Sequence, residues 1–200
     1  RTLFDQSPVG VYIFDRDLRI TQCNERMAKI LKSSYDKIIG LDLRKLKDQG
    51  FVPAAEKAIE GYPSYHEGFY EATTSPTKLW LSQRFSPLRD TNGNVIGGMG
   101  VVEDVSRRKL AEQKLIASEV RYRRLFESAQ DGILILDADT GQITDVNPFL
   151  IGLLGYSRDE LLGKTLWEIG LFQDVEISQR AFQELQREEY VRYDNLPLET

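Results

Sequence analysis

The sequence predicts an α+β fold, in which a five-stranded antiparallel sheet carries its helices on one face. Three observations support this prediction. Runs of strand length and helical segments follow one another in the order β-β-α-α-α-β-β-β. The same pattern begins again in the second half of the chain. An uninterrupted helical segment lies between the two parts, so we expect two copies of one domain joined by a long helix.

Two stretches of the chain repeat one another. Residues 3–15 align with residues 125–137 at an offset of 122 (125 minus 3), and after a one-residue insertion the offset becomes 123 (143 minus 20). A period this long exceeds that of solenoid repeats, so each copy is expected to fold by itself. The matching positions include Leu3 and Leu125, Phe4 and Phe126, Gly10 and Gly132, Ile20 and Ile143, Asn24 and Asn147, and Gly40 and Gly163.

The first copy opens with a predicted hairpin. Residues 10–15 and 19–23 are short apolar or alternating runs joined by a tight polar turn. Three short helices are expected next, because each segment has a capping residue or a terminal glycine. They are the helix capped by Asn24 that extends through Leu31, the helix opened by Ser34 and ended by Gly40, and the helix at residues 53–60 closed by Gly61.

Three more strands complete the first copy, at residues 65–73, 78–88 and 95–102, with a turn at 90–93 between the last two. Residues 65–73 carry aromatic side chains at both odd and even positions, so alternation does not assign which face of this strand points inward. Alternation assigns the faces of the other two strands. It puts Leu79, Leu81, Gln83 and Phe85 opposite Trp80, Ser82 and Arg84, and Gly98, Gly100 and Val102 opposite Met99, Val101 and Glu103.

The second copy begins with the same signals and lacks the last two strands. Asn147 precedes Pro148 at a helix start, and Ser157 with Glu160 forms a predicted capping box. A third helix is expected from Asp174, with an apolar face at Ile177, Ala181 and Leu185. Thr200 corresponds to Thr77 (200 minus 123). We therefore expect a fragment of a longer sensor whose second sheet is partly open or completed by another chain.

The segment 104–126 predicts one long helix. It contains no Gly or Pro, and Asp104 or Ser106 can cap its first turn. One interpretation is a helix on the surface of its own domain; the other is a rod that pairs with a second copy through apolar positions at 4,3,4,3 spacing. Those positions are Ala111, Leu115, Ser118, Tyr122 and Leu125. The predicted domains are 1–105, the linker helix 106–127, and 128–200.

The composition argues against several protein classes. The net charge is −5, and the basic residues of the predicted linker helix lie among acidic ones, so no nucleic acid is expected as a partner. A single cysteine provides no disulfide and no metal cluster, which is typical of a reducing compartment. No run of 18 apolar residues is present, so we expect no direct membrane insertion and a cytoplasmic location, with a parent chain that is free to be membrane-tethered.

The closing segment of the first copy, SPLRDTNGNVIGGMGVVEDVSRRK at residues 86–109, resembles that of PAS sensory domains. Residues 104–108 look like the D-[IV]-[ST]-x-R signature that closes a PAS domain and begins its output helix. The hairpin followed by an Asn-capped helix and the repeated LFE-type openings are also similar to this family. The resemblance implies a PAS fold in both copies and a sheet order of second, first, fifth, fourth and third strand.

PAS domains use the side of the sheet that faces the helices as a pocket. This implies a ligand cavity in the first copy with Gln83 as its polar anchor. The alternative is that the helices fill this space and the glycines relieve a crowded strand. The expected lining residues are Phe14, Leu79, Leu81, Gln83, Phe85, Gly98 and Gly100.

The resemblance also implies a signal relay through Asp104, Ser106 and Arg108. A ligand bound in the first copy would shift the final strand, and Asp104 would cap the output helix and pair with Arg108 four residues later.

No cofactor is identified from the sequence. Flavin-linked light-oxygen-voltage domains carry N-C-R-F-L-Q at a helix start, whereas Cys23 and Asn24 stand in the opposite order at the end of the hairpin. Cys23 is expected to be a small core residue. Haem-binding members place an axial histidine before the third strand, and here His66 lies within that strand. We therefore expect neither a Cys-adduct flavin nor haem.

The residues of this chain predict no enzyme. A single histidine and a single cysteine form no Ser-His-Asp or Cys-His set, and no G-x-x-x-x-G-K-[ST] loop is present. The predicted function is a sensory input module of a signalling protein of the histidine-kinase type, whose kinase or output domain lies beyond Thr200 in the same chain. Its expected partners are a second copy, through the linker helix and domain edges, and a small molecule. The alternative is a ligand-free dimerisation or spacer module.

Overall fold

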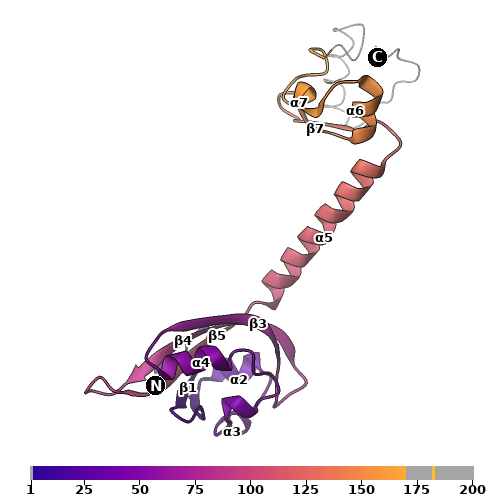
Figure 1. Cartoon of the computed structure of the whole chain (residues 1–200). Helices are drawn as coiled ribbons and strands as arrows, with labels where there is room; N and C mark the ends of the chain where they lie inside the picture. The colour runs from indigo at the N-terminus through magenta and orange to yellow at the C-terminus, as the bar shows by residue number, and fades with distance from the viewer. Residues whose placement is uncertain (1, 170–181, 183–200) are drawn as a thin grey trace. The chain divides into compact units, whose positions relative to one another are not determined.

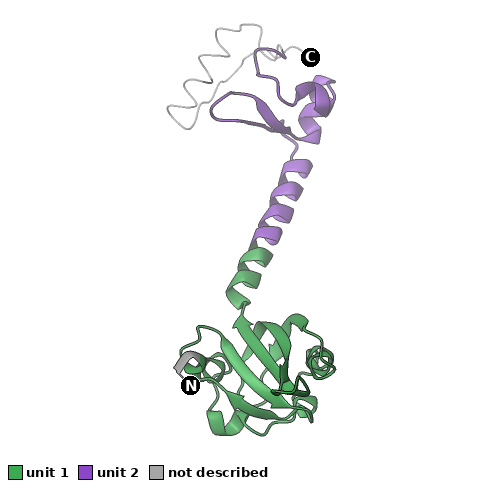
Figure 2. Ribbon diagram, turned by 90° about the vertical axis from the view of Figure 1, so that its left-hand side faces the viewer, with its two compact units in different colours: residues 1–114 green, residues 115–200 purple. Residues whose placement is uncertain are grey.

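The computed structural model describes residues 2–169 and Phe182. The chain divides into two compact units, residues 1–114 and 115–200, which are coloured separately in Figure 2. The boundary between the units falls inside the long helix.

The first unit contains a five-stranded antiparallel sheet in the order β2-β1-β5-β4-β3. This arrangement confirms the predicted α+β fold and strand order. Helices α2, α3 and α4 lie over one face of the sheet (Figure 1). The strands are β1 (Gly10–Asp15), β2 (Ile20–Cys23), β3 (Ser64–Glu71), β4 (Lys78–Arg89) and β5 (Val95–Asp104). The helices are α1 (Thr2–Asp5), α2 (Glu25–Ile30), α3 (Tyr35–Ile38), the 3-10 turn η1 (Leu43–Lys45) and α4 (Val52–Ile59).

The alternation of β4 determines which side chains enter the core. The four side chains predicted to share a face, Leu79, Leu81, Gln83 and Phe85, are all buried. On the other face Arg84 is exposed and Trp80 is half-buried. Ser82 also belongs to that face, yet it is buried because β4 lies between β3 and β5 and the Tyr65 hydroxyl lies 3.5 Å from the Ser82 hydroxyl.

Asn24 ties the first hairpin to α2. Its side-chain oxygen accepts hydrogen bonds from the backbone N–H groups of Val11 and Met27, both at 2.9 Å. Its amide nitrogen donates to the carbonyls of Phe4 and Val9 at 3.0 and 2.9 Å. The predicted cap therefore also satisfies backbone groups of the preceding segment, which explains why a polar side chain is fully buried here.

The second unit repeats this opening. Strands β6 (Leu134–Leu136) and β7 (Ile143–Val146) form a hairpin, followed by α6 (Pro148–Leu154) and α7 (Arg158–Leu161). Asn147 caps α6, and Ser157 with Glu160 forms the predicted capping box of α7. The helix predicted from Asp174, with Ile177, Ala181 and Leu185, lies outside the described residues. How this sheet is completed stays a prediction.

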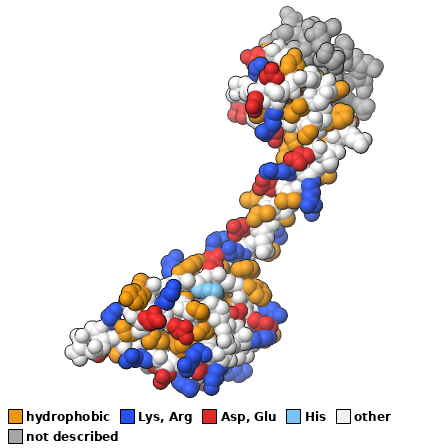
Figure 3. Space-filling model, in the orientation of Figure 1, with side chains coloured by type: hydrophobic (Ala, Val, Ile, Leu, Met, Phe, Trp, Pro, Cys, Tyr) orange, Lys and Arg blue, Asp and Glu red, His pale blue; other side chains and the backbone are white. Residues whose placement is uncertain are grey.

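The predicted long helix is present as α5 (Ser106–Ser128) and continues without a break past Lys114. Most of its side chains are exposed, and Figure 3 shows apolar and charged side chains alternating on its surface. Each compact unit includes part of this helix. The domain limits at 105 and 127 stay a prediction. Within the described part of the chain, no helix is long and apolar enough to cross a membrane.

Candidate functional site

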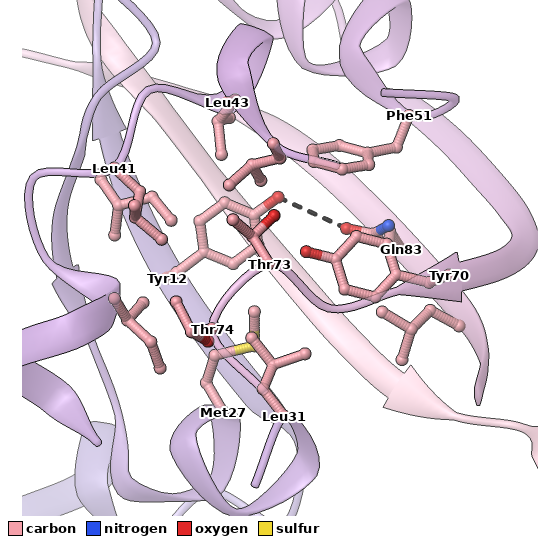
Figure 4. A pocket seen from close by; sticks show the side chains of 14 residues that line it. Tyr12, Met27, Leu31, Leu41, Leu43, Phe51, Tyr70, Thr73, Thr74 and Gln83 are labelled. Atoms are coloured by element: carbon pink, nitrogen blue, oxygen red, sulfur yellow. Dashed lines mark hydrogen bonds between the residues drawn. The ribbon is translucent and has the colours of Figure 1, made fainter. Parts of the chain in front are cut away.

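A small cavity lies in the first unit between the sheet and its helices (Figure 4). Apolar side chains from α2, η1 and the loops form most of its wall, among them Met27, Leu31 and Leu43. The volume open to the centre of a water-sized sphere is about 20 Å³. A volume of this size holds about one water molecule. In this conformation the side chains therefore fill most of the space.

Two buried polar groups lie together in the cavity wall. The hydroxyl of Tyr12 lies 3.4 Å from Oε1 of Gln83, to which it donates (Figure 4). Burial raises the pKa of Tyr12 well above its usual value, and burial with the nearby Asp48 raises the pKa of Tyr70 to about 12. Both phenols are therefore neutral at ordinary pH. The cavity presents uncharged hydrogen-bonding groups in an apolar wall, which suits a small neutral molecule more than an ion.

The structure brings some of the predicted lining residues to the cavity and places others elsewhere in the core. Leu81 and Gln83 line it. Phe14, Leu79 and Phe85 are buried in the core, and Phe14 and Phe85 pack edge to face at 6.2 Å.

The predicted glycines make room for aromatic rings. A Cβ at Gly98 would lie 2.3 Å from Cζ of Phe14, and a Cβ at Gly100 would lie 2.6 Å from Cε1 of Tyr12. Gly98 is opposite Phe14 and Gly100 is opposite Tyr12 in the register of β5 with β1. The space left by these glycines is therefore occupied by the two rings.

Several lining residues were missed by the sequence reasoning. Tyr12 had a signal, since it precedes the predicted Phe14 by two residues on the same face of β1. Tyr70 had none, because aromatic residues occupy both parities of its strand. Thr73 and Thr74 line the cavity from the loop after β3, where no periodicity applies.

The start of α5 is anchored on β4. The carbonyl of Trp80 accepts the backbone N–H of Val105, and the hydroxyl of Ser106 accepts the N–H of Trp80, both at 2.9 Å. The Oδ1 of Asp104 accepts the N–H of Ser106, the first residue of the helix, at 2.9 Å. Arg108 differs from the prediction: its Nη2 donates to Oε2 of Glu67 at 2.8 Å.

The carboxylate of Glu67 on β3 accepts hydrogen bonds from three side chains. Lys109 Nζ lies 2.8 Å from Oε1, while Arg108 and the Tyr65 hydroxyl donate to Oε2. These hydrogen bonds, with Lys109 first, lower the pKa of Glu67 to about 2. Lys109 also lies over the Trp80 ring, 5.7 Å from its centroid. The sequence reasoning missed Glu67 because 41 residues separate it from Arg108.

The two residues considered for cofactor chemistry have ordinary surroundings. Cys23 is buried at the end of β2, and burial raises the pKa of its thiol. His66 is half-buried on β3. Among the described residues, no group of three or more His, Cys, Asp or Glu side chains is placed to hold a metal ion.

Comparisons with known proteins match both parts of the chain to one family. The model described as "PAS fold" matches residues 4–110, and the model described as "PAS domain" matches residues 120–190. Sporulation kinase E of Bacillus subtilis is 24% identical over 179 residues, which cover 88% of this chain and 23% of that protein. The two-component sensor PprA of Pseudomonas aeruginosa is 26% identical over 192 residues, which cover 84% of this chain and 19% of that protein.

Solved structures are similar in fold. The structure of an RNA-binding light-oxygen-voltage receptor is 19% identical and superposes with a TM-score of 0.50. The match covers 60% of this chain and 36% of that chain.

Proposed function

The chain belongs to the PAS family, and from this premise we propose that it is the sensory input part of a longer signalling protein, of the histidine-kinase type. The observation that carries the proposal is that PAS models match residues 4–110 and 120–190. The chain spans only about a quarter or less of the two kinase-type relatives, at 23% and 19% of their lengths. Kinase activity therefore belongs to other parts of the parent protein in this proposal.

The first unit is proposed to bind a small neutral molecule next to Tyr12 and Gln83. These two groups offer one hydroxyl and one amide in an apolar wall, which would orient a molecule that carries a single polar group. Binding requires the cavity to enlarge, and the unbranched Met27 on its wall can change rotamer to do so. A ligand that prefers the enlarged form would shift the population of the unit toward it.

Native mass spectrometry of the whole chain tests ligand binding directly. The expected result is a bound species of small mass that is lost from the Gln83→Leu variant. Ser82→Ala is the matched control, because Ser82 is the neighbour of Gln83 on the opposite face of β4. Retention of the same species by Gln83→Leu would place the ligand elsewhere, and absence of any bound species from the native chain would contradict ligand binding.

The second candidate function is a ligand-free dimerisation or spacer module. The observation that favours it is the cavity volume of about 20 Å³, which leaves no room for more than a water molecule in this conformation. In that case native mass spectrometry detects the chain without any bound small molecule. Added extracts of small metabolites then leave the thermal unfolding midpoint of the chain unchanged.

A second copy of this chain is the proposed partner of α5. Leu115, Tyr122 and Leu125 lie on the predicted seam and are 71%, 46% and 66% exposed. Exposed apolar positions at this spacing are typical of two-helix packing. Sedimentation of Leu115→Glu is expected to show loss of dimer, whereas Ile116→Glu, at a position off the seam that is also exposed, at 54%, retains it. The opposite result would contradict this seam.

A further inference from the structure

The cavity and α5 are connected through β3 and β4, whereas the relay expected from the sequence used β5. Tyr70 on β3 and both Leu81 and Gln83 on β4 line the cavity. Among the described residues, none of β5 does so. The rings of Tyr12 and Phe14 cover the inward glycines Gly100 and Gly98. At these two positions the rings therefore separate β5 from the cavity.

We propose that Glu67 is a positioning residue that couples β3, and through it the cavity, to the first turns of α5. This inference rests on the proposed sensory function of the first unit. It assigns to Glu67 the role that the sequence reasoning gave to a pair between Asp104 and Arg108.

The contacts of Glu67 hold two consecutive residues of the helix. Its two carboxylate oxygens bind Arg108 and Lys109 separately, each at 2.8 Å. The Glu67 side chain is 18% exposed and that of Lys109 is 24% exposed, so this pair is better shielded from solvent than the ion pair of Lys29 with Glu25, at 62% and 68%. Partial shielding makes an ion pair less sensitive to salt screening. A displacement of Glu67 therefore changes the contacts of two helix residues at once.

The position of β3 makes it the mobile member of this connection. It is an edge strand, hydrogen-bonded only to β4, whereas β5 pairs with both β1 and β4. An edge strand shifts at the cost of fewer backbone hydrogen bonds than a central one. Tyr70 points to the cavity three residues after Glu67, which points to the opposite face. Occupation of the cavity therefore pushes on the same strand that holds the helix.

The backbone contacts of Trp80 supply a fixed point for the helix start. Its N–H and carbonyl bind Ser106 and Val105, and these bonds do not involve β3. A shift of Glu67 would then change the direction of the first helical turns about this fixed point, without detaching the helix.

Hydrogen exchange of the whole 200-residue chain, measured by mass spectrometry, tests the coupling. Glu67→Gln is expected to raise the exchange rate of amides in residues 107–112 roughly threefold, the effect of losing a partly exposed ion-pair network. The matched control is Glu71→Gln, because Glu71 lies on the same strand and face and pairs with Lys47 and Lys78 instead of α5. Equal exchange in the wild-type and Glu67→Gln chains would overturn the proposal, as would the same increase in both variants.

A second measurement tests transmission from the cavity without any ligand. Leu46→Phe, or Leu31→Phe if the first variant does not fold, adds volume at the cavity wall from a residue that is not part of β3. The expected change in exchange at residues 107–112 is present in the wild-type and Glu71→Gln backgrounds and absent from Glu67→Gln. A response that persists in Glu67→Gln would overturn the coupling through Glu67. This outcome is independent of native mass spectrometry, so failure of ligand binding and failure of the coupling are distinguishable.

Discussion

Replacement of Asn24 by alanine is expected to destabilise the first unit more than the loss of an ordinary helix cap. The side chain makes four hydrogen bonds, to Val11, Met27, Phe4 and Val9. An ordinary cap substitution costs about 1 kcal/mol. At about 1 kcal/mol for each bond, Asn24→Ala costs about 4 kcal/mol. Since domains are stable by roughly 5–15 kcal/mol, this is a large fraction of the total.

Urea unfolding followed by tryptophan fluorescence measures this loss unit by unit. The chain has two tryptophans, Trp80 and Trp167, one in each unit. A Trp167→Phe background therefore leaves a signal from the first unit alone. Asn24→Ala is expected to lower the urea midpoint with little change in slope.

Asn147 provides the matched control in the second unit. Its side chain makes three hydrogen bonds, to Ile133, Leu150 and Asp131, so Asn147→Ala should cost about 3 kcal/mol there and leave the Trp80 signal unchanged. A loss of about 1 kcal/mol or less for Asn24→Ala would refute the reasoning, because it would mean that the side chain acts only as a cap.

Three further predictions concern single positions. Gly100→Ala should destabilise the first unit by about 1–3 kcal/mol in the same urea assay, because the new Cβ would lie 2.6 Å from the Tyr12 ring; an unchanged midpoint would contradict this. The pKa values of Asp42 and Glu67 are lowered to about 2 in the folded chain, so their stabilisation is complete above the unfolded values of 3.8 and 4.5 and is lost as the pH falls toward 2. As the pH is lowered from 4.5 toward 2, the urea midpoint should fall less steeply for Glu67→Gln than for the wild type. Equal falls in the two chains would contradict the pairing of the Glu67 carboxylate in the folded state. Gly152→Ala, in a helix with open space around the new Cβ, should stabilise the second unit by up to about 1 kcal/mol, and circular dichroism would show a lower thermal midpoint if the site were crowded.

Local signals determined the elements of this protein. As helix caps, Asn24, Asn147 and Ser157 each accept the N–H of the residue three positions later, so their capping roles followed from sequence spacing alone. Alternation along β4 predicted the buried face because side chains of a strand point to opposite sides with a period of two. The strand order was not predicted from local residue patterns. It was implied by the family resemblance, and the observed sheet confirms it.

The interior of the first unit was decided by tertiary packing. The glycines of β5 suggested empty volume, but the register with β1 places the rings of Tyr12 and Phe14 over them. Arg108 had an acidic residue at helical spacing, Asp104, yet it binds Glu67 from a strand that is distant in sequence. Sequence spacing indicates which side chains can meet within one helix or strand. Which of them meet depends on how edge strands, side-chain volumes and charges are brought together from separate elements, and that geometry exists only after the chain has folded.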